Sequence, residues 1–164
     1  MVAAAEVAPG DLVVDIGAGA GALTRPLLAA GARVVAVELH PRRAAELRRH
    51  FAAADCRVVE LDIVRFTLPA CRFRVVANPP FAVLAQLLRK LTTSGSRLQR
   101  ADVVVPLHVA GRWARGAGVG AARFDARVVR RLPPDAFVPP AQPAAVLRLE
   151  PRRSGPRSPG RGHT

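Results

Sequence analysis

Four short segments of the sequence carry groups suited to chemistry, and each follows a run of apolar residues. They are a glycine-rich segment from Asp15 to Gly21, the carboxylates Glu38 and Asp62, and an Asn-Pro-Pro-Phe segment at residues 78–81. If the apolar runs are strands of an open parallel sheet, the four segments meet at the carboxyl edge of that sheet, where ligands bind. The sequence therefore predicts one ligand site built from four strand ends.

The Asn-Pro-Pro-Phe segment is the most specific of the four. The exocyclic amino group of a nucleobase is a poor nucleophile because its lone pair is delocalised into the ring. The side-chain carbonyl of Asn78 and the backbone carbonyl of Pro79 can accept its two N–H groups and direct the lone pair at an electrophile. The prolines fix the backbone, and Phe81 offers a face for a base taken out of its stack. The competing interpretation is an ordinary proline-rich turn with a core aromatic residue.

The other three segments predict a cofactor site. The glycine-rich segment lets a small molecule approach the backbone where a Cβ atom would collide with it, and it also satisfies the dinucleotide-binding pattern. Glu38 can accept two hydrogen bonds from a ribose diol, which fits nicotinamide and adenosyl cofactors alike. Asp62 can accept a hydrogen bond from an adenine amino group. The competing interpretations are a solvated strand-end carboxylate for Glu38 and a helix cap or loop role for Asp62.

The elements that must position these segments alternate between strands and helices. Apolar runs predict strands at residues 12–16, 33–39, 56–61, 74–77, 102–105, 123–132 and 145–150. Apolar residues at helical spacing predict helices at residues 23–30, at residues 41–53 and after Phe81. Polar and glycine-rich composition predicts a loop at residues 92–99 and a mobile loop at residues 116–120. This alternation predicts an α/β, Rossmann-like, doubly wound sheet that is mostly parallel and ends in an antiparallel hairpin.

The charge of the chain indicates a polyanionic partner. Lys and Arg number 25 against 12 Asp and Glu, a formal net charge of +13, and the resulting field attracts nucleic acid. A bias toward GC-rich codons explains arginine in place of lysine more readily than it explains this excess of bases. The arginines expected to contact RNA are Arg42, Arg43, Arg112, Arg152 and Arg153.

Other classes of protein are disfavoured by what the sequence lacks. No apolar run is long enough to cross a bilayer, and the N-terminus is not a signal peptide. The two cysteines and four histidines show no metal-ligand spacing. We expect a cytoplasmic, monomeric protein without a bound metal. One domain is expected at residues 1–150, followed by a disordered basic tail at residues 151–164.

Together these segments resemble the ribosomal RNA adenine N6-methyltransferases, which include the macrolide-resistance (erythromycin-resistance) methylases and the small-subunit adenine dimethyltransferases. The resemblance runs from about Met1 to Glu150, and residues 137–147 look like the family's loop and last strand. It implies a seven-stranded class I methyltransferase sheet with one antiparallel strand near the end, and S-adenosylmethionine as the cofactor. The implied cofactor contacts are Asp15, Gly17, Gly19, Gly21, Glu38, Asp62 and Asn78. The implied catalytic residues are Asn78, Pro79 and Phe81.

The resemblance implies direct transfer of a methyl group to adenine N6 in ribosomal RNA, with no covalent enzyme intermediate. Without the family's C-terminal helical domain, the chain is most similar to the short resistance methylases. This similarity favours large-subunit 23S RNA as the substrate and macrolide-type antibiotic resistance as the outcome. The alternatives are a small-subunit adenine dimethyltransferase, a DNA adenine methyltransferase and a nicotinamide-dependent reductase. Only 14 residues precede Asp15, where the family has a further cofactor-binding segment. This indicates a start codon assigned too late or a truncation, and it adds a catalytically silent RNA-binding remnant to the alternatives.

Overall fold

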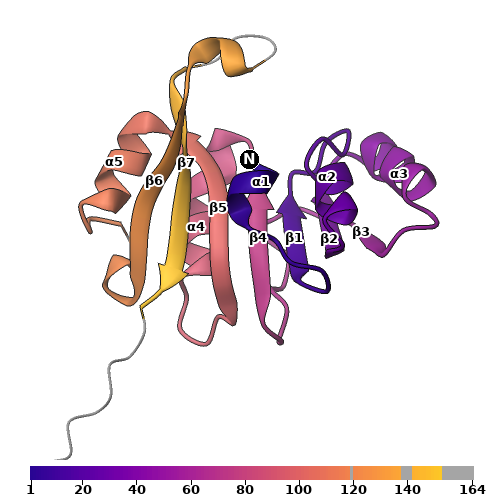
Figure 1. Ribbon diagram of the computed structural model, residues 1–164, viewed down its shortest axis with the longest axis horizontal. Helices are drawn as coiled ribbons and strands as arrows, with labels where there is room; N and C mark the ends of the chain where they lie inside the picture. Colours follow the sequence, from indigo (N-terminus) through magenta and orange to yellow (C-terminus); the bar gives the residue numbers. More distant parts are fainter. Residues whose placement is uncertain (119, 138–141, 153–164) are drawn as a thin grey trace, which may run out of the picture.

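A seven-stranded sheet forms the centre of the computed structural model, which describes residues 1–118, 120–137 and 142–152 (Figure 1). The strand order is β3-β2-β1-β4-β5-β7-β6. The strands are β1 Leu12–Ile16, β2 Arg33–Glu38, β3 Cys56–Glu60, β4 Phe73–Ala77, β5 Leu98–Pro106, β6 Phe124–Leu132 and β7 Ala144–Pro151. β7 runs antiparallel to both β5 and β6, whereas the pairs among β1 to β5 are parallel. The predicted mostly parallel sheet with one antiparallel strand near its end is confirmed.

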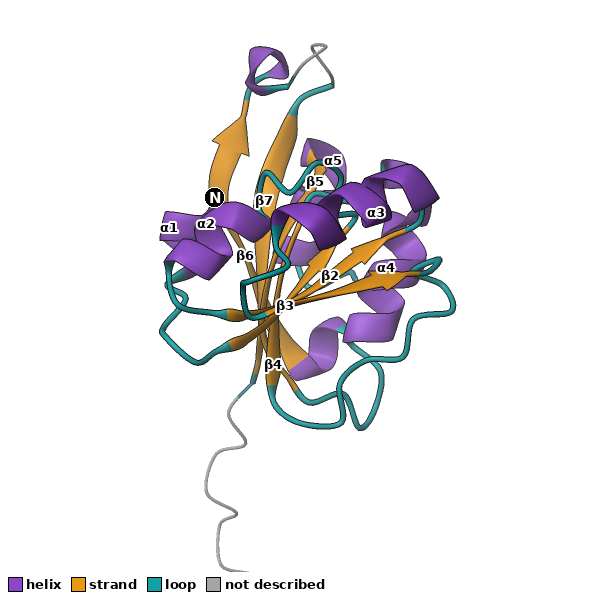
Figure 2. Ribbon diagram, turned by 90° about the vertical axis from the view of Figure 1, so that its right-hand side faces the viewer, coloured by secondary structure: helices purple, strands orange, loops and turns teal. Residues whose placement is uncertain are grey.

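Helices cover both faces of the sheet. They are α1 Val2–Ala5, α2 Thr24–Ala29, α3 Pro41–His50, α4 Leu84–Leu91 and α5 Leu107–Ala114, with 3₁₀ turns η1 Phe81–Val83, η2 Ala121–Arg123 and η3 Pro134–Ala136. Figure 2 shows α1, α2 and α3 on one face and α4 and α5 on the other. Val13 and Val34 pack with Leu27 on the first face, and Val75 packs with Leu87 on the second. Because both faces are covered, the central strands β1, β2 and β4 are near-continuous apolar runs. No helix of the described residues is long and apolar enough to cross a bilayer.

The structure corrects two details of the predicted elements. β5 begins at Leu98, not at residue 102, because Leu98 is buried and pairs with Phe73 in β4. α3 ends at His50, three residues before the predicted end. In the glycine-rich stretch at residues 116–120, a Cβ on Gly118 would lie only 2.2 Å from the Trp113 ring, so this glycine packs directly on α5, and the mobility of the stretch stays a prediction. The predicted tail falls mostly on residues 153–164, which lie outside the described residues.

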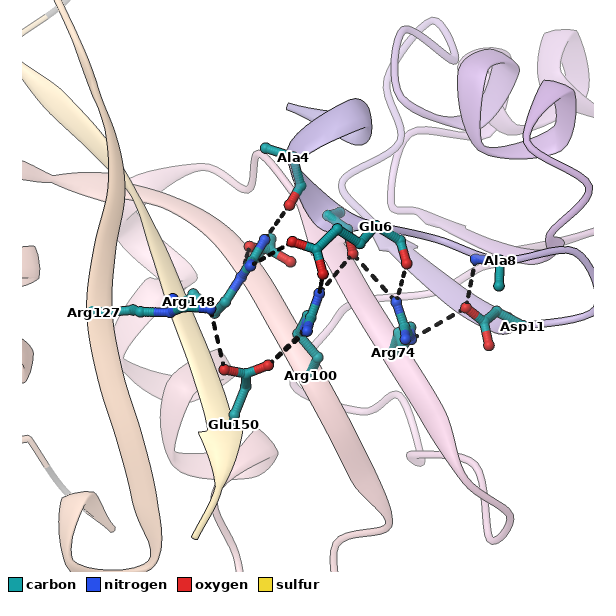
Figure 3. A network of polar contacts seen from close by, with 11 residues as sticks. Ala4, Glu6, Ala8, Asp11, Arg74, Arg100, Arg127, Arg148 and Glu150 are labelled. Carbon is teal, nitrogen blue, oxygen red and sulfur yellow. Dashed lines mark hydrogen bonds and ion pairs between the residues drawn. The ribbon is translucent and has the colours of Figure 1, made fainter.

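A network of arginines fastens α1 and the segment after it to the sheet (Figure 3). Arg148 of β7 forms a buried ion pair of 2.8 Å with Asp102 of β5 and also donates to a carbonyl group of α1. Arg100 lies 3.1 Å from the carboxylate of Glu6, and Arg74 donates to the Glu6 backbone carbonyl at 2.8 Å. These three arginines therefore all have partners in α1 or in the segment that leads into β1.

Candidate active site

A pocket of about 440 Å³ lies at the carboxyl ends of β1, β2 and β4, beside the point where the strand order reverses. Its volume falls in the range of small-molecule sites. The structure brings one member of each predicted segment into its wall, namely Gly17, Glu38, Asp62 and the Asn-Pro-Pro-Phe segment. Strand ends that are up to about sixty residues apart in the sequence thus meet in one cavity, as an open α/β sheet requires.

Glu38 links the glycine-rich segment to the start of α3. Its Oε2 accepts a hydrogen bond of 2.8 Å from the backbone N–H of Gly19, and its Oε1 accepts one of 2.8 Å from His40. The side chain is buried, and it still borders the pocket. A carboxylate offers about four acceptor positions, so both oxygens can accept a further hydrogen bond from a ligand.

Asp15, Gly19 and Gly21 do not line the pocket, although all three were expected to contact the cofactor. Side chains alternate along a strand, and the Asp15 side chain is fully buried, with its Oδ2 accepting a 2.7 Å hydrogen bond from the Thr24 hydroxyl. Burial raises the pKa of Asp15 to about 6. Gly21 has a φ of +84°, and a Cβ there would lie 2.9 Å from the Phe51 ring. These residues therefore contribute to the conformation of the glycine-rich segment without lining the pocket.

Asp62 begins a turn that Lys90 holds in place from α4. The Asp62 Oδ1 accepts a hydrogen bond of 2.9 Å from Val64 N–H, so the predicted loop role is present, and the residue also lines the pocket. The Lys90 ammonium group donates to the carbonyls of Ile63, Val64 and Phe66 at 3.0, 2.7 and 2.5 Å. Three donors on one atom suit this geometry, whereas the planar fork of arginine does not.

The Asn-Pro-Pro-Phe segment directly follows β4. Asn78 is exposed at the pocket, Pro79 is buried, and the Pro80 carbonyl accepts a 3.1 Å hydrogen bond that begins η1. Gly17, with φ +73°, faces this segment, and a Cβ there would lie 3.5 Å from both Pro79 Cα and Pro80 Cδ. The glycine therefore leaves open the gap between the ends of β1 and β4.

Apolar side chains complete the pocket, and sequence reasoning did not identify them as site residues. Leu39 is 64% exposed although it is a large aliphatic residue, and Ile63 lies on the turn that Lys90 holds. Phe137, from the connection between β6 and β7, adds a second aromatic residue to the lining, besides Phe81. Buried carboxylate, exposed aliphatic faces and open glycine backbone together fit an adenosyl cofactor. Among the described residues, no group of three His, Cys, Asp or Glu is placed to hold a metal ion.

The arginines expected to contact RNA do not form one surface. Arg43 lines the pocket, and Arg42 is exposed on the same helix. Arg112 borders a second groove, between α4 and α5. β7 runs antiparallel to β5, so it ends on the side of the sheet away from the carboxyl ends of the parallel strands. Arg152 follows β7 on that side and forms an ion pair with Asp125 at 3.0 Å. Arg153 lies outside the described residues.

The strand order and the antiparallel seventh strand define the class I methyltransferase fold. The crystal structure of the 23S rRNA methyltransferase ErmE superposes with a TM-score of 0.81 at 28% identity, covering 95% of this chain and 67% of that one. A dimethyladenosine transferase from Plasmodium falciparum shares the fold, with a TM-score of 0.81 at 22% identity over 92% of this chain and 59% of its own.

The profile of the family described as ribosomal RNA adenine dimethylase matches residues 1–159, and the chain belongs to that family. Ribosomal RNA small subunit methyltransferase A from Thermosynechococcus vestitus is 38% identical over 96% of this chain and 65% of its own length. The mycinamicin-resistance protein MyrB from Micromonospora griseorubida is 35% identical over 88% of this chain and 48% of its own. The chain thus spans about half to two thirds of these relatives, and the predicted family and fold are both confirmed.

Proposed function

We propose that this chain binds S-adenosylmethionine in the pocket and transfers its methyl group to N6 of an adenine in ribosomal RNA. The observation that carries the proposal is the meeting of Glu38 and Asp62 with the Asn-Pro-Pro-Phe segment in one cavity. A cofactor site alone would fit several chemistries. The Asn78 and Pro79 carbonyls beside the cofactor site favour methylation of an amino group, because they can accept its two N–H groups.

In the proposed complex, the cofactor supplies an electrophilic methyl group bound to sulfur. Glu38 accepts hydrogen bonds from the ribose diol through the acceptor positions that its backbone contacts leave. Asp62 accepts from the adenine amino group, and Leu39 and Ile63 pack on the two sides of the adenine ring. The open backbone at Gly17 lies toward the methionine end of the cofactor.

The target adenine occupies the part of the pocket beside the Asn-Pro-Pro-Phe segment. The Asn78 side chain and the Pro79 carbonyl accept the two N6–H groups, which turns the nitrogen lone pair toward the methyl group. Phe81 stacks on the base, and Phe137 bounds it from the connection between β6 and β7. Transfer would form a bond from N6 to the methyl carbon as the C–S bond breaks, the sulfur would keep that electron pair and leave as the thioether, and the extra N6 proton would pass to water.

We propose the small ribosomal subunit as the first substrate, in the cytoplasm. Small-subunit methyltransferases predominate among the similar curated relatives. They support small-subunit RNA as the substrate better than large-subunit 23S RNA, which the sequence analysis favoured from the length of the chain. Large-subunit RNA is the second candidate, because a mycinamicin-resistance protein and a 23S rRNA methyltransferase are also similar. Membership of a ribosomal RNA family disfavours the DNA and nicotinamide alternatives.

The proposal is tested with labelled S-adenosylmethionine and unmodified transcripts of small-subunit and large-subunit ribosomal RNA. We expect label in the small-subunit transcript, and label in the large-subunit transcript alone would select the second candidate. Calorimetry with the cofactor separates an enzyme from a silent remnant. A protein that binds neither cofactor nor label would refute the proposal.

A further inference from the structure

A second cavity, of about 480 Å³, adjoins the pocket and lies between α4 and α5. Phe81 lines both cavities, so they meet at this residue. The inner wall is apolar and includes Leu84, Leu88 and Val109, while His108 and Arg112 border it from α5. We refer to this cavity as the α4–α5 groove.

The rim of the α4–α5 groove is basic, and none of the described residues that line it is acidic. Arg89 on α4 and Arg112 on α5 both border it and are exposed. Within the described residues, no carboxylate forms an ion pair with either arginine. Arg112 is oriented by a 3.1 Å hydrogen bond from its Nε to the Ala117 carbonyl, which leaves its two terminal nitrogens to contact a ligand.

The charge of the surrounding chain favours an anionic occupant. Between Asp62 and Asp125 the sequence holds ten basic residues and one acidic residue, Asp102. Asp102 is buried in its ion pair with Arg148 and takes no part in the surface around the groove. A ligand that combines a flat apolar body with a phosphate group matches an apolar wall edged by two unpaired guanidinium groups.

We propose that the α4–α5 groove binds the nucleotide next to the target adenosine in the RNA strand. The inference rests on the proposed function, because a target base on one side of Phe81 brings its neighbour with it. The phosphodiester bond keeps that neighbour within one nucleotide of the pocket, and the groove begins there. Its base lies on the apolar wall, and its phosphate contacts Arg89 and Arg112. The enzyme thereby reads two adjacent nucleotides and keeps the target strand unstacked.

The test measures binding of short single-stranded RNAs, with one adenosine among uridines, by fluorescence anisotropy. S-adenosylhomocysteine fills the cofactor pocket, and the RNAs carry an abasic site at the adenosine, on its 5′ side or on its 3′ side. We expect the abasic adenosine to weaken binding, and one of the two flanking abasic sites to weaken it by about tenfold, as for loss of one stacked base. The other flanking site should have little effect.

Two variants connect this loss to the groove. Ala85→Trp fills the groove from the exposed face of α4, and it should remove the difference between the intact and the flanking-abasic RNA. Arg89→Gln should weaken binding of the intact RNA more than Arg72→Gln, a matched loss of charge at an exposed position before β4. Ala45→Trp, on the exposed face of α3, is the control for added bulk.

The outcomes separate the two proposals. If the abasic adenosine weakens binding but neither flanking abasic site does, the target pocket stands and the groove proposal is overturned. The same holds if Ala85→Trp leaves the flanking difference intact, since the groove would then serve another partner such as a protein. If even the abasic adenosine binds as tightly as the intact RNA, the target pocket itself is refuted.

Discussion

Replacing Lys90 with methionine should weaken cofactor binding although Lys90 does not line the pocket. Its ammonium group donates three hydrogen bonds, of 3.0, 2.7 and 2.5 Å, to the turn that carries Asp62 and Ile63. Methionine keeps the apolar stem and removes every donor. Hydrogen bonds from charged donors contribute about 1.5–3 kcal/mol each, and leaving their acceptors unpaired costs a similar amount when the group is buried.

Lys90 is half-buried and water can replace part of these contacts, so we expect the ordered turn to lose about 2 kcal/mol relative to open forms. That corresponds to a change of about thirtyfold in the ratio of ordered to open turn. Since the apparent dissociation constant is inversely proportional to the fraction in the binding-competent form, it should rise between about threefold and thirtyfold.

Calorimetric titration with S-adenosylhomocysteine measures this change, and Gln86→Met, at an exposed position of the same helix, is the matched control. Lys90 is the only lysine in the chain. Its acylation, followed by mass spectrometry, therefore reports the state of the turn directly and should slow when the ligand binds. An unchanged dissociation constant in folded Lys90→Met, with acylation of the wild type unaffected by ligand, would refute the role of the turn.

Three further predictions follow from the buried polar groups. The pKa of Asp15 is raised from 3.8 to about 6, so the folded state binds its proton more tightly and stability falls as pH rises across that interval, by about 3 kcal/mol in total. Asp15→Asn should lose this part of the pH dependence, and urea unfolding at about pH 5 and about pH 7 would contradict the account if the two proteins changed in parallel. Arg148→Met should cost about 3–5 kcal/mol because Asp102 is left buried and unpaired. Adding Asp102→Leu should restore most of that loss in the same unfolding assay, and no recovery would show that the ion pair is not the cause. Glu38→Gln replaces one acceptor oxygen with an amide nitrogen that faces a backbone N–H, so cofactor affinity should fall about tenfold or more. Unchanged affinity in a calorimetric titration would exclude the proposed hydrogen bonds from Glu38 to the ribose diol.

The strand ends could be predicted because local sequence determines them. The apolar runs end at Ile16, Val37 and Ala77, and the polar or glycine residues that follow must lie at one edge of a parallel sheet. The antiparallel pairing of β6 and β7 was also predictable, from two apolar segments near the end of the chain. These features depend on residue type and order along the chain.

Other parts of the site depend on contacts between distant segments, which the sequence alone does not specify. Lys90 reaches a turn 24 to 27 residues earlier, and its only sequence signal is that one lysine is kept among 25 basic residues. Phe137 reaches the pocket from the far end of the sheet order. The start of β5 was missed because Gln99 and Arg100 interrupt the apolar run, although Leu98 is buried by pairing with β4. The error arose because pairing with the neighbouring strand β4 decides which positions of β5 are buried, and the sequence of β5 alone does not show it.

Identification of the modified nucleoside tests the central claim most directly. Ribosomal RNA transcripts incubated with the protein and S-adenosylmethionine are digested to nucleosides and separated by liquid chromatography with mass spectrometry. We expect N6-methylated adenosine from the wild-type protein and none from Asn78→Ala. Methylation at a different atom or on a different base, or undiminished N6 methylation by Asn78→Ala, would contradict the assignment of the Asn-Pro-Pro-Phe segment as the site that presents the adenine amino group.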